Sequence, residues 1–234
     1  MAKRIYIIGE FSPGWETHEA TNRALAHSAA LLGIEIQTAW LSSQGLDFNL
    51  LLSANAIWIA PGSPYKNLEN TLEAIRIARE RKIPTIGTCG GFQYMIVEYA
   101  RNVLGIAEAQ HMEHDADASL LFISKLACSL KGKTLPIQLA PGSQAQKIYA
   151  ADRIEESYYC QFGINPDILD TLTASGDMVF SGSDPEGENR ILERPDHPFF
   201  IGTLFVPQTR STAEKPHPLV TALLNSPSHS SSSS

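Results

Sequence analysis

The chain has 234 residues, of which 43% are hydrophobic and 18% charged, and its formal net charge is −7. This length fits one large α/β domain or at most two small ones, and no apolar run approaches the roughly eighteen residues of a membrane span. The negative charge and the lack of Lys/Arg clusters argue against nucleic acid or a membrane surface as the partner.

The first hundred residues alternate between predicted strands and helices. Continuous apolar runs predict buried strands, and apolar residues at helical spacing predict helices. We expect strands at 5–8, 34–41, 56–60 and 83–88, and helices at 19–32, 67–81 and from about 92 onward. This rhythm indicates a mostly parallel sheet with helices on both faces, which binds ligands at the carboxyl ends of its strands.

The second half of the chain is less regular. We expect strands at 120–126, 137–140 and 199–205, a hairpin formed by 178–182 and 189–193, and helices at 164–172 and 217–225. Residues 1–225 therefore form one predicted domain. The Ser-rich residues 226–234 are predicted to be a disordered tail.

The three cysteines, Cys89, Cys128 and Cys160, are few and widely spaced. This spacing argues against a disulfide framework or a zinc site and indicates a reducing cytoplasm. The short apolar run at 5–8 ends in Gly9 rather than in a cleavage site, so we interpret it as a strand and not as a signal peptide.

Cys89 lies where a predicted strand gives way to a helix. Gly87, Gly90 and Gly91 surround it, and such glycines allow a sharp strand-to-helix turn whose central residue is strained. The turn would aim the thiol along a helix N-terminus, which lowers the pKa of a thiol. A nucleophilic cysteine is therefore favoured over the alternative, a buried structural cysteine.

Several stretches together resemble the glutaminase domain of CTP synthase, a class I glutamine amidotransferase. They are A-P-G at 60–62, G-T-C-G-G-F-Q at 87–93, E-Y-A-R-N-V-L-G at 98–105, F-S-G at 180–182 and E-R-P-D-H-P-F-F at 193–200. The resemblance covers nearly the whole chain and implies a flavodoxin-like α/β fold. No synthase domain is present in these residues, so we expect a stand-alone relative that does not itself make CTP.

The resemblance also implies roles for residues around the predicted turn. Cys89 would attack a side-chain amide and form a thioester, and the backbone N–H groups of Gly62 and Gly90 would form the oxyanion hole. Gln93 and Glu113 would hold the substrate, with Glu113 receiving an ammonium group. The alternative for Glu113 is a solvated charge on a loop.

The chain departs from the family pattern where the acid and base should lie. The family has a His and a Glu at the positions of Val206 and Gln208, so the triad is degenerate. Residues 156–165 lack the Arg that holds the α-carboxylate of glutamine in the family. These departures argue against ordinary glutamine hydrolysis.

His111 is the candidate for a relocated base, since it lies two residues before Glu113. The alternatives are that His111 and His114 are exposed loop histidines, or that they bind a metal with neighbouring acids; adjacent loop ligands without a distant partner are weak evidence for a metal. Tyr159 or Arg190 would recognise the other end of the substrate.

Two functions follow from these residues. The first is a cysteine-dependent amidase acting on a small polar amide other than glutamine, one that carries an ammonium group, without cofactor or metal. The second is an inactive relative that binds a metabolite or a partner protein, as a homo-oligomer or as one subunit of a complex. The cysteine favours the first function and Val206 favours the second.

Overall fold

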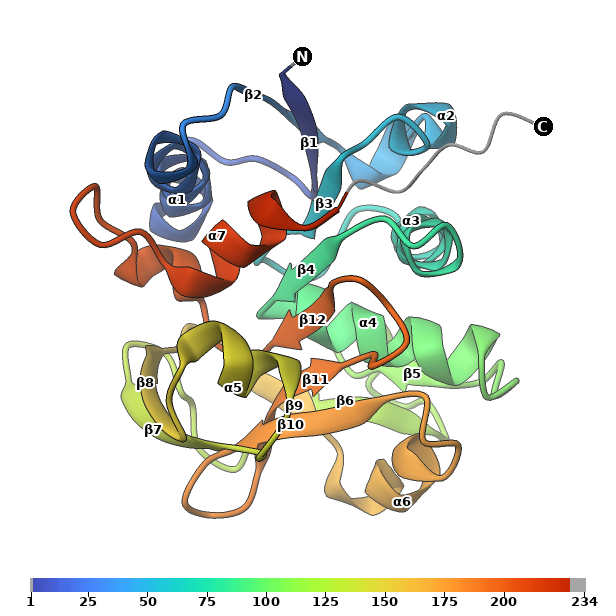
Figure 1. Cartoon of the computed structure of the whole chain (residues 1–234). Coiled ribbons are helices and arrows are strands. Elements are labelled where there is room, and N and C mark those ends of the chain that lie inside the picture. Colours follow the sequence, from blue (N-terminus) through green and yellow to red (C-terminus); the bar gives the residue numbers. More distant parts are fainter. Residues whose placement is uncertain (1, 228–234) are drawn as a thin grey trace.

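This computed structural model describes residues 2–227 of the chain. Their largest element is a nine-stranded sheet. Its strand order is β2-β1-β3-β4-β12-β11-β10-β7-β8 (Figure 1). The predicted Ser-rich tail lies almost wholly outside the described residues, so its disorder stays a prediction. The predicted α/β fold is confirmed.

The half of the sheet nearest the N-terminus is parallel. It consists of β1 (Lys3–Ile8), β2 (Ile36–Leu41), β3 (Ala56–Ile59), β4 (Thr85–Thr88) and β12 (Phe200–Thr203). Every residue of β3, β4 and β12 is buried, because helices cover both faces of these strands. The carboxyl ends of β3, β4 and β12 therefore meet at one edge, where the predicted turns follow.

The other half of the sheet is antiparallel, so the sheet is mixed rather than mostly parallel throughout. It consists of β11 (Asn189–Glu193), β10 (Val179–Ser183), β7 (Thr134–Leu139) and β8 (Arg153–Ser157). The predicted hairpin is β10 and β11, with an irregular register around Gly182. A second sheet, in the order β5-β6-β9, joins β5 (Gln110–His111), β6 (Leu121–Lys125) and β9 (Phe162–Ile164).

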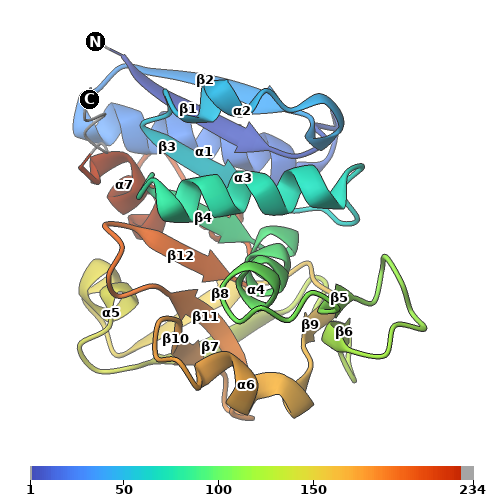
Figure 2. The ribbon, with the colours of Figure 1, turned by 90° about the vertical axis from the view of Figure 1, so that its right-hand side faces the viewer.

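Helices cover the parallel half on both faces. Figure 2 shows α3 (Leu68–Glu80) and α4 (Gly90–Asn102) in front of the sheet, with α1 (Glu16–Leu32) and α7 (Pro218–Asn225) behind it. The short helices are α2 (Phe48–Leu51), α5 (Gln144–Tyr149) and α6 (Leu169–Thr173), and 3-10 turns lie at 43–45, 166–168 and 207–210. None of the helices described is long and apolar enough to cross a membrane.

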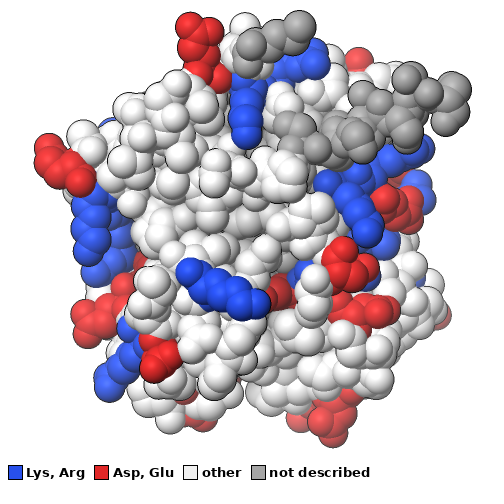
Figure 3. All heavy atoms as spheres, viewed as in Figure 1, with Lys and Arg blue, Asp and Glu red and all other residues white. Residues whose placement is uncertain are grey.

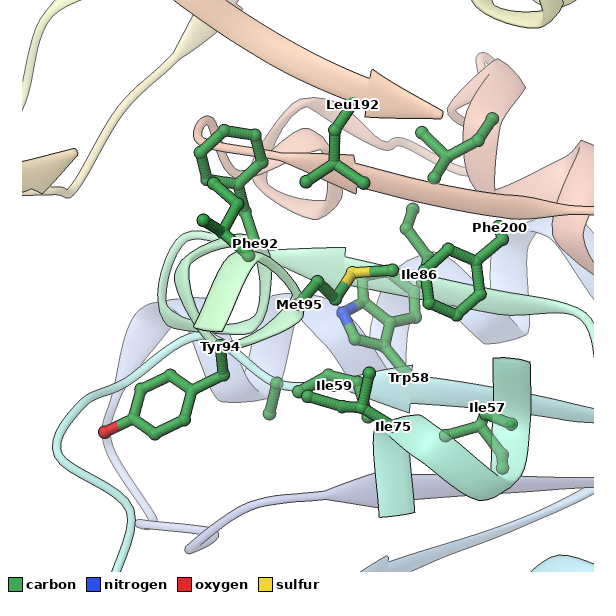
Figure 4. Close-up of a cluster of buried hydrophobic side chains, with 14 of the residues drawn as sticks. Ile57, Trp58, Ile59, Ile75, Ile86, Phe92, Tyr94, Met95, Leu192 and Phe200 are labelled. Carbon is green, nitrogen blue, oxygen red and sulfur yellow. The ribbon is translucent and has the colours of Figure 1, made fainter. Parts of the chain in front are cut away.

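Helix α4 is anchored in the core along nearly its whole length. Met95 lies beside Trp58, Ile86 and Phe200 in Figure 4, and every residue of α4 from its first to Ala100 is buried. The buried Glu98 accepts a hydrogen bond of 2.7 Å from Arg79 of α3. The position of the N-terminus of α4 is therefore fixed by packing and by an ion pair.

Charged side chains on the face of Figure 1 lie mostly around its rim. Lys and Arg are interleaved there with Asp and Glu, and the middle of this face is uncharged except for basic side-chain atoms just below its centre (Figure 3). The prediction that nucleic acid is not a partner remains a prediction.

Candidate active site

Cys89 occupies the sharp turn between β4 and α4. Its φ of 51° and ψ of −105° lie in a region that non-glycine residues rarely adopt. Strain of this kind persists only where the surrounding structure enforces it, and it is concentrated at functional sites. The predicted strained turn is confirmed.

Two glycines beside Cys89 are required by packing. A Cβ on Gly87 would lie 2.4 Å from Met95 Sδ, and a Cβ on Gly91 would lie 2.2 Å from the carbonyl oxygen of Ile59. The second contact is with backbone, which cannot move aside as a flexible side chain can. The close approach of α4 to β3 and β4 therefore depends on these glycines.

The turn after β3 faces the turn at Cys89. Gly62 has a φ of +106°, and a Cβ on Gly90 would lie 3.0 Å from the carbonyl oxygen of Gly62. Gly90 is the first residue of α4, so its N–H has no partner within the helix. The backbone amides of Gly62 and Gly90 therefore lie beside each other and next to the cysteine.

His18 of α1 holds the turn after β3. Its Nδ1 accepts a hydrogen bond of 3.0 Å from the Ser12 N–H, so the neutral ring carries its proton on Nε2 and donates to the carbonyl of Pro61 at 3.0 Å. Burial lowers the pKa of His18 and keeps the ring neutral. Sequence reasoning missed this residue, although a histidine in the first turn of a helix after Pro13-Gly14 was a visible signal.

A pocket of about 340 Å³ opens beside Cys89. Its charged lining consists of Glu16, Glu113 and Lys131. The remaining lining residues include Trp15, Pro61, Gly62, Ser63, Gln93, Tyr159, Cys160, Gln161 and Phe162. The pocket has room for a small polar molecule.

Cys160 brings a second sulfur to the pocket. The structure joins Cys89 and Cys160 as a disulfide, with their Cα atoms 6.0 Å apart. Cys160 is 2% exposed, and its sulfur also lies 2.9 Å from the carbonyl oxygen of Leu204. The low cysteine count did not predict this pair, because Cys160 reaches the site through the irregular loop between β8 and β9.

The family model for Glutamine amidotransferase class-I matches residues 16–226. The chain belongs to the class I glutamine amidotransferases. It is 31% identical to a CTP synthase of Methanopyrus kandleri over 94% of this chain and 44% of the relative. It is 32% identical to a CTP synthase of Cytophaga hutchinsonii over 92% of this chain and 42% of the relative. The chain thus spans less than half the length of these relatives.

Solved structures of amidotransferases share the fold. The glutaminase domain of a Trypanosoma brucei CTP synthase with bound acivicin matches with a TM-score of 0.86 and 20% identity, over 95% of this chain and 92% of that one. A glutamine amidotransferase from Thermotoga maritima matches with a TM-score of 0.59 and 10% identity, over 89% of this chain and 77% of that one. The predicted resemblance to the CTP synthase glutaminase domain is confirmed.

His111 is hydrogen-bonded to Gln93. Nδ1 of His111 accepts from the Glu113 N–H at 3.1 Å, and Nε2 lies 3.0 Å from Gln93 Oε1. His111 is fully buried, and desolvation lowers its pKa to about 3. It is therefore not an exposed loop histidine, and both ring nitrogens already have hydrogen-bond partners, Glu113 and Gln93, which speaks against the predicted role as base.

Gln93, Glu113 and Tyr159 line the pocket, as expected for residues that contact a substrate. Gln93 donates to the carbonyl of Phe162 at 2.8 Å, which fixes the amide between β9 and His111. Oε2 of Glu113 has no hydrogen-bond partner among the described residues. The Tyr159 hydroxyl donates to Glu16 of α1 across the pocket wall.

Arg190 lies elsewhere, which corrects the prediction that it recognises the substrate. Its guanidinium pairs with Asp184 at 2.6 Å, and both side chains are buried. The two residues lie at opposite ends of the β10–β11 connection, so the pair closes the hairpin. Arg190 is not among the residues that line the pocket.

The two residues at the predicted triad positions, Val206 and Gln208, are buried. Val206 is fully buried, and its N–H donates to the Ser157 carbonyl at 2.9 Å. Gln208 is 1% exposed, and neither oxygen nor nitrogen of its amide has a partner among the described residues. Neither side chain supplies a base.

Proposed function

We propose that this domain is a cysteine-dependent amidase that cleaves a small polar amide other than glutamine through a Cys89 thioester. The observation that carries the proposal is the position of Cys89 on a strained turn, at the N-terminus of α4, facing a pocket and two backbone amides. The Trypanosoma brucei neighbour is a glutaminase domain with bound acivicin, which supports a site of this class in the same fold.

The backbone around Cys89 would supply the chemistry of acyl transfer. The Cys89 thiolate would attack the amide carbon, and the N–H groups of Gly62 and Gly90 would stabilise the negative oxygen of the tetrahedral intermediate. Collapse would expel ammonia once water in the open pocket has protonated the leaving nitrogen, and a second water would then hydrolyse the thioester to the acid and the free Cys89 thiol. Removing the base of a nucleophile–base pair costs on the order of 10⁴ to 10⁶ in rate, but a cysteine loses less because part of it is thiolate at neutral pH.

The charges of the pocket favour a substrate with a cation. Glu16 and Glu113 line it with a single lysine, Lys131, and Gln161 lies in the segment where the family pattern has an arginine for the glutamine carboxylate. Glu113 Oε2 is buried, has no hydrogen-bond partner among the described residues and lies 3.8 Å from Nε2 of the neutral His111, so its negative charge is not neutralised there. We therefore assign Glu113 as the partner of a substrate ammonium group. Gln93, whose side chain is hydrogen-bonded to His111, is assigned to contact the substrate as well.

A second function, binding without turnover, is favoured by two observations on the site. Val206 replaces the base with an apolar side chain, and Cys89 is paired with Cys160. A domain without a base and with its nucleophile in a disulfide would bind a metabolite or a partner protein without turnover. The two functions share the pocket and differ in whether Cys89 reacts.

The test uses protein reduced with a phosphine. We expect iodoacetamide to alkylate Cys89 with an apparent pKa below about 8.5. We also expect amides that carry an ammonium group but no carboxylate to release ammonia faster than glutamine, which carries both. Cys89→Ala is the control, and it should bind the same amides by calorimetry without turnover. Equal binding by both proteins, with no ammonia from any amide and slow alkylation, would support the second function instead.

A further inference from the structure

The two sulfurs at the pocket are positioned for reversible bond formation. The Cα–Cα distance of 6.0 Å between Cys89 and Cys160 lies within the range of about 4.4–6.8 Å that disulfides require. The separation of the two backbones is therefore compatible with a disulfide. Cys128 is exposed and free, so the chain also contains a cysteine outside the pair.

The surroundings make the two thiols unequal. Cys89 is half-buried, lines the open pocket and lies at the N-terminus of the 13-residue helix α4, where a thiolate is favoured. Cys160 is 2% exposed and, as a thiol, can donate to the Leu204 carbonyl at 2.9 Å, which favours its protonated form. A small oxidant that enters the pocket would therefore react at Cys89.

We propose that Cys89 and Cys160 form a reversible redox pair, in which hydroperoxides oxidise Cys89 and Cys160 resolves the product. The Cys89 thiolate attacks the distal oxygen of the hydroperoxide and becomes a sulfenic acid, while the alcohol or water leaves. The Cys160 sulfur then attacks the Cys89 sulfur, a disulfide forms, and the sulfenic oxygen leaves as water. An external dithiol reduces the disulfide and is itself oxidised.

This pairing would switch the site off and also protect it. A nucleophile held in a disulfide cannot attack an amide, and a sulfenic acid that is resolved quickly does not proceed to the irreversible sulfinic acid. The inference rests on the proposed function in one respect, the reactivity of Cys89.

The test follows the mass of the reduced full chain after addition of hydrogen peroxide. We expect a loss of two hydrogen atoms, a peptide that links Cys89 to Cys160, and recovery of iodoacetamide labelling after dithiothreitol. Cys160→Ser should instead give a dimedone adduct at Cys89 when dimedone is present and a sulfinic acid at Cys89 when it is absent, so that without dimedone the labelling recovers to less than about a tenth. Cys128→Ser is the matched control and should behave as the parent.

Two other outcomes would overturn the redox pair, and one of them would also overturn the amidase proposal. If Cys89 of the parent proceeds to sulfinic acid as fast as Cys89 of Cys160→Ser, or pairs with Cys128, the redox pair is wrong while the amidase proposal stands. If reduced Cys89 reacts with neither peroxide nor iodoacetamide, both are wrong.

A second inference rests on a different observation, the contact between His18 and the turn after β3. The carbonyl of Pro61 and the N–H of Gly62 belong to one trans peptide unit and therefore point in opposite directions. His18 Nε2 holds that carbonyl at 3.0 Å, and His18 is itself 2% exposed and fixed by Ser12. The direction of the Gly62 N–H is thus set by a side chain of α1.

We infer that His18 is a positioning residue for the oxyanion hole of the proposed amidase. A donor must point at the place where the negative oxygen develops, and loss of one such donor costs about 10² to 10³ in rate. The neutral ring, packed against Trp15 and Trp40 at centroid distances of 5.0 and 4.9 Å, has no freedom to turn away.

Two reagents separate positioning from stability. Acylation of Cys89 by p-nitrophenyl acetate passes through an oxyanion, whereas alkylation by iodoacetamide does not. We expect His18→Phe to lower the rate of acylation about tenfold or more and to leave alkylation unchanged, and His18→Gln, which keeps a donor, to recover most of the loss. An unchanged ratio of the two rates in His18→Phe overturns the inference, and a parent chain that reacts with neither reagent overturns the amidase proposal.

Discussion

The two walls of the pocket are built differently. The wall formed by the turn after β3 and the N-terminus of α4 presents backbone groups, placed by glycines and by the strained Cys89. The opposite wall, formed by the β8–β9 loop, presents the side chains of Cys160 and Gln161. The segment after β12 lies behind it, where the Leu204 carbonyl contacts Cys160 and where Val206 and Gln208 are buried. Backbone geometry depends on the whole packing, whereas a side-chain function is lost by one substitution. The first wall therefore has the backbone geometry predicted for an amidotransferase, whereas the loss of the family's base and arginine from the second wall stays a prediction.

The largest effect is expected at the glycines of the first wall. Gly91→Ala places a Cβ 2.2 Å from the Ile59 carbonyl oxygen and should lower the free energy of unfolding by about 3 kcal/mol or more. Urea unfolding measures this loss of stability. A Gly91→Ala variant that does not refold at all would agree with the same prediction. Gly45→Ala is the control, since a Cβ there meets nothing within 4 Å. Equal stability of the two variants would show that α4 can move away from β3.

Two buried glutamines compare the walls directly. The amide of Gln93 is bonded to Phe162 and His111, so Gln93→Met leaves two buried groups unpaired and should cost about 2 kcal/mol. The amide of Gln208 has no partner among residues 2–227, so Gln208→Met should be neutral or stabilise by about 1 kcal/mol. Urea unfolding of both variants measures the difference. A large cost at Gln208 would mean that its amide has a partner after all, such as an ordered water.

The neutral His111 should make stability depend on pH. Its pKa is about 3 in the folded chain and about 6.5 when unfolded, so the contribution is complete above pH 6.5 and is lost as the pH falls toward 3. Between pH 7 and pH 5 this loss is about 2 kcal/mol. His111→Gln should reduce the fall in unfolding free energy over that interval by the same amount. An unchanged fall would mean that His111 is protonated in the folded chain.

The smallest effect is expected at Lys131, the one lysine that lines the pocket within residues 2–227. Lys131→Met should change stability by less than about 0.5 kcal/mol, because the residue is exposed. It should lower the rate of Cys89 alkylation by the anion iodoacetate about fivefold relative to neutral iodoacetamide, since a cation nearby is worth about 1 kcal/mol. Lys133→Met lies outside the pocket lining and should leave the ratio unchanged. The same ratio in both variants would place Lys131 too far from the sulfur to act.

The first wall, formed by the turn after β3 and the N-terminus of α4, was predicted from the sequence because residues close together along the chain specify it. The apolar runs of β1, β3 and β4 and the glycines around Cys89 lie within a few residues of the features they specify. The opposite wall depends on contacts between distant segments, such as Gln93 with Phe162 and Cys160 with Leu204. No periodicity marks these contacts, so the pairing of Cys160 with Cys89 was not predicted.

The misplaced arginine has a similar explanation. The sequence suggests a free cation at Arg190, but Asp184 at the other end of the same hairpin neutralises it. An acid and a base that flank a short turn pair more readily with each other than with a ligand. His18 was missed for the opposite reason, since its partner Pro61 is 43 residues away along the chain.

The position of β12 has a consequence for biosynthesis. This strand lies in the middle of the sheet, between β4 and β11, although it comes from the last part of the chain, and its Thr203 carbonyl accepts the Cys89 N–H at 2.8 Å. Until a ribosome has released residues 200–203, β4 and β11 are open edges, and pairings this distant in sequence form slowly. The nucleophile is thus completed late, so an incomplete chain carries an unshielded thiol but no finished site.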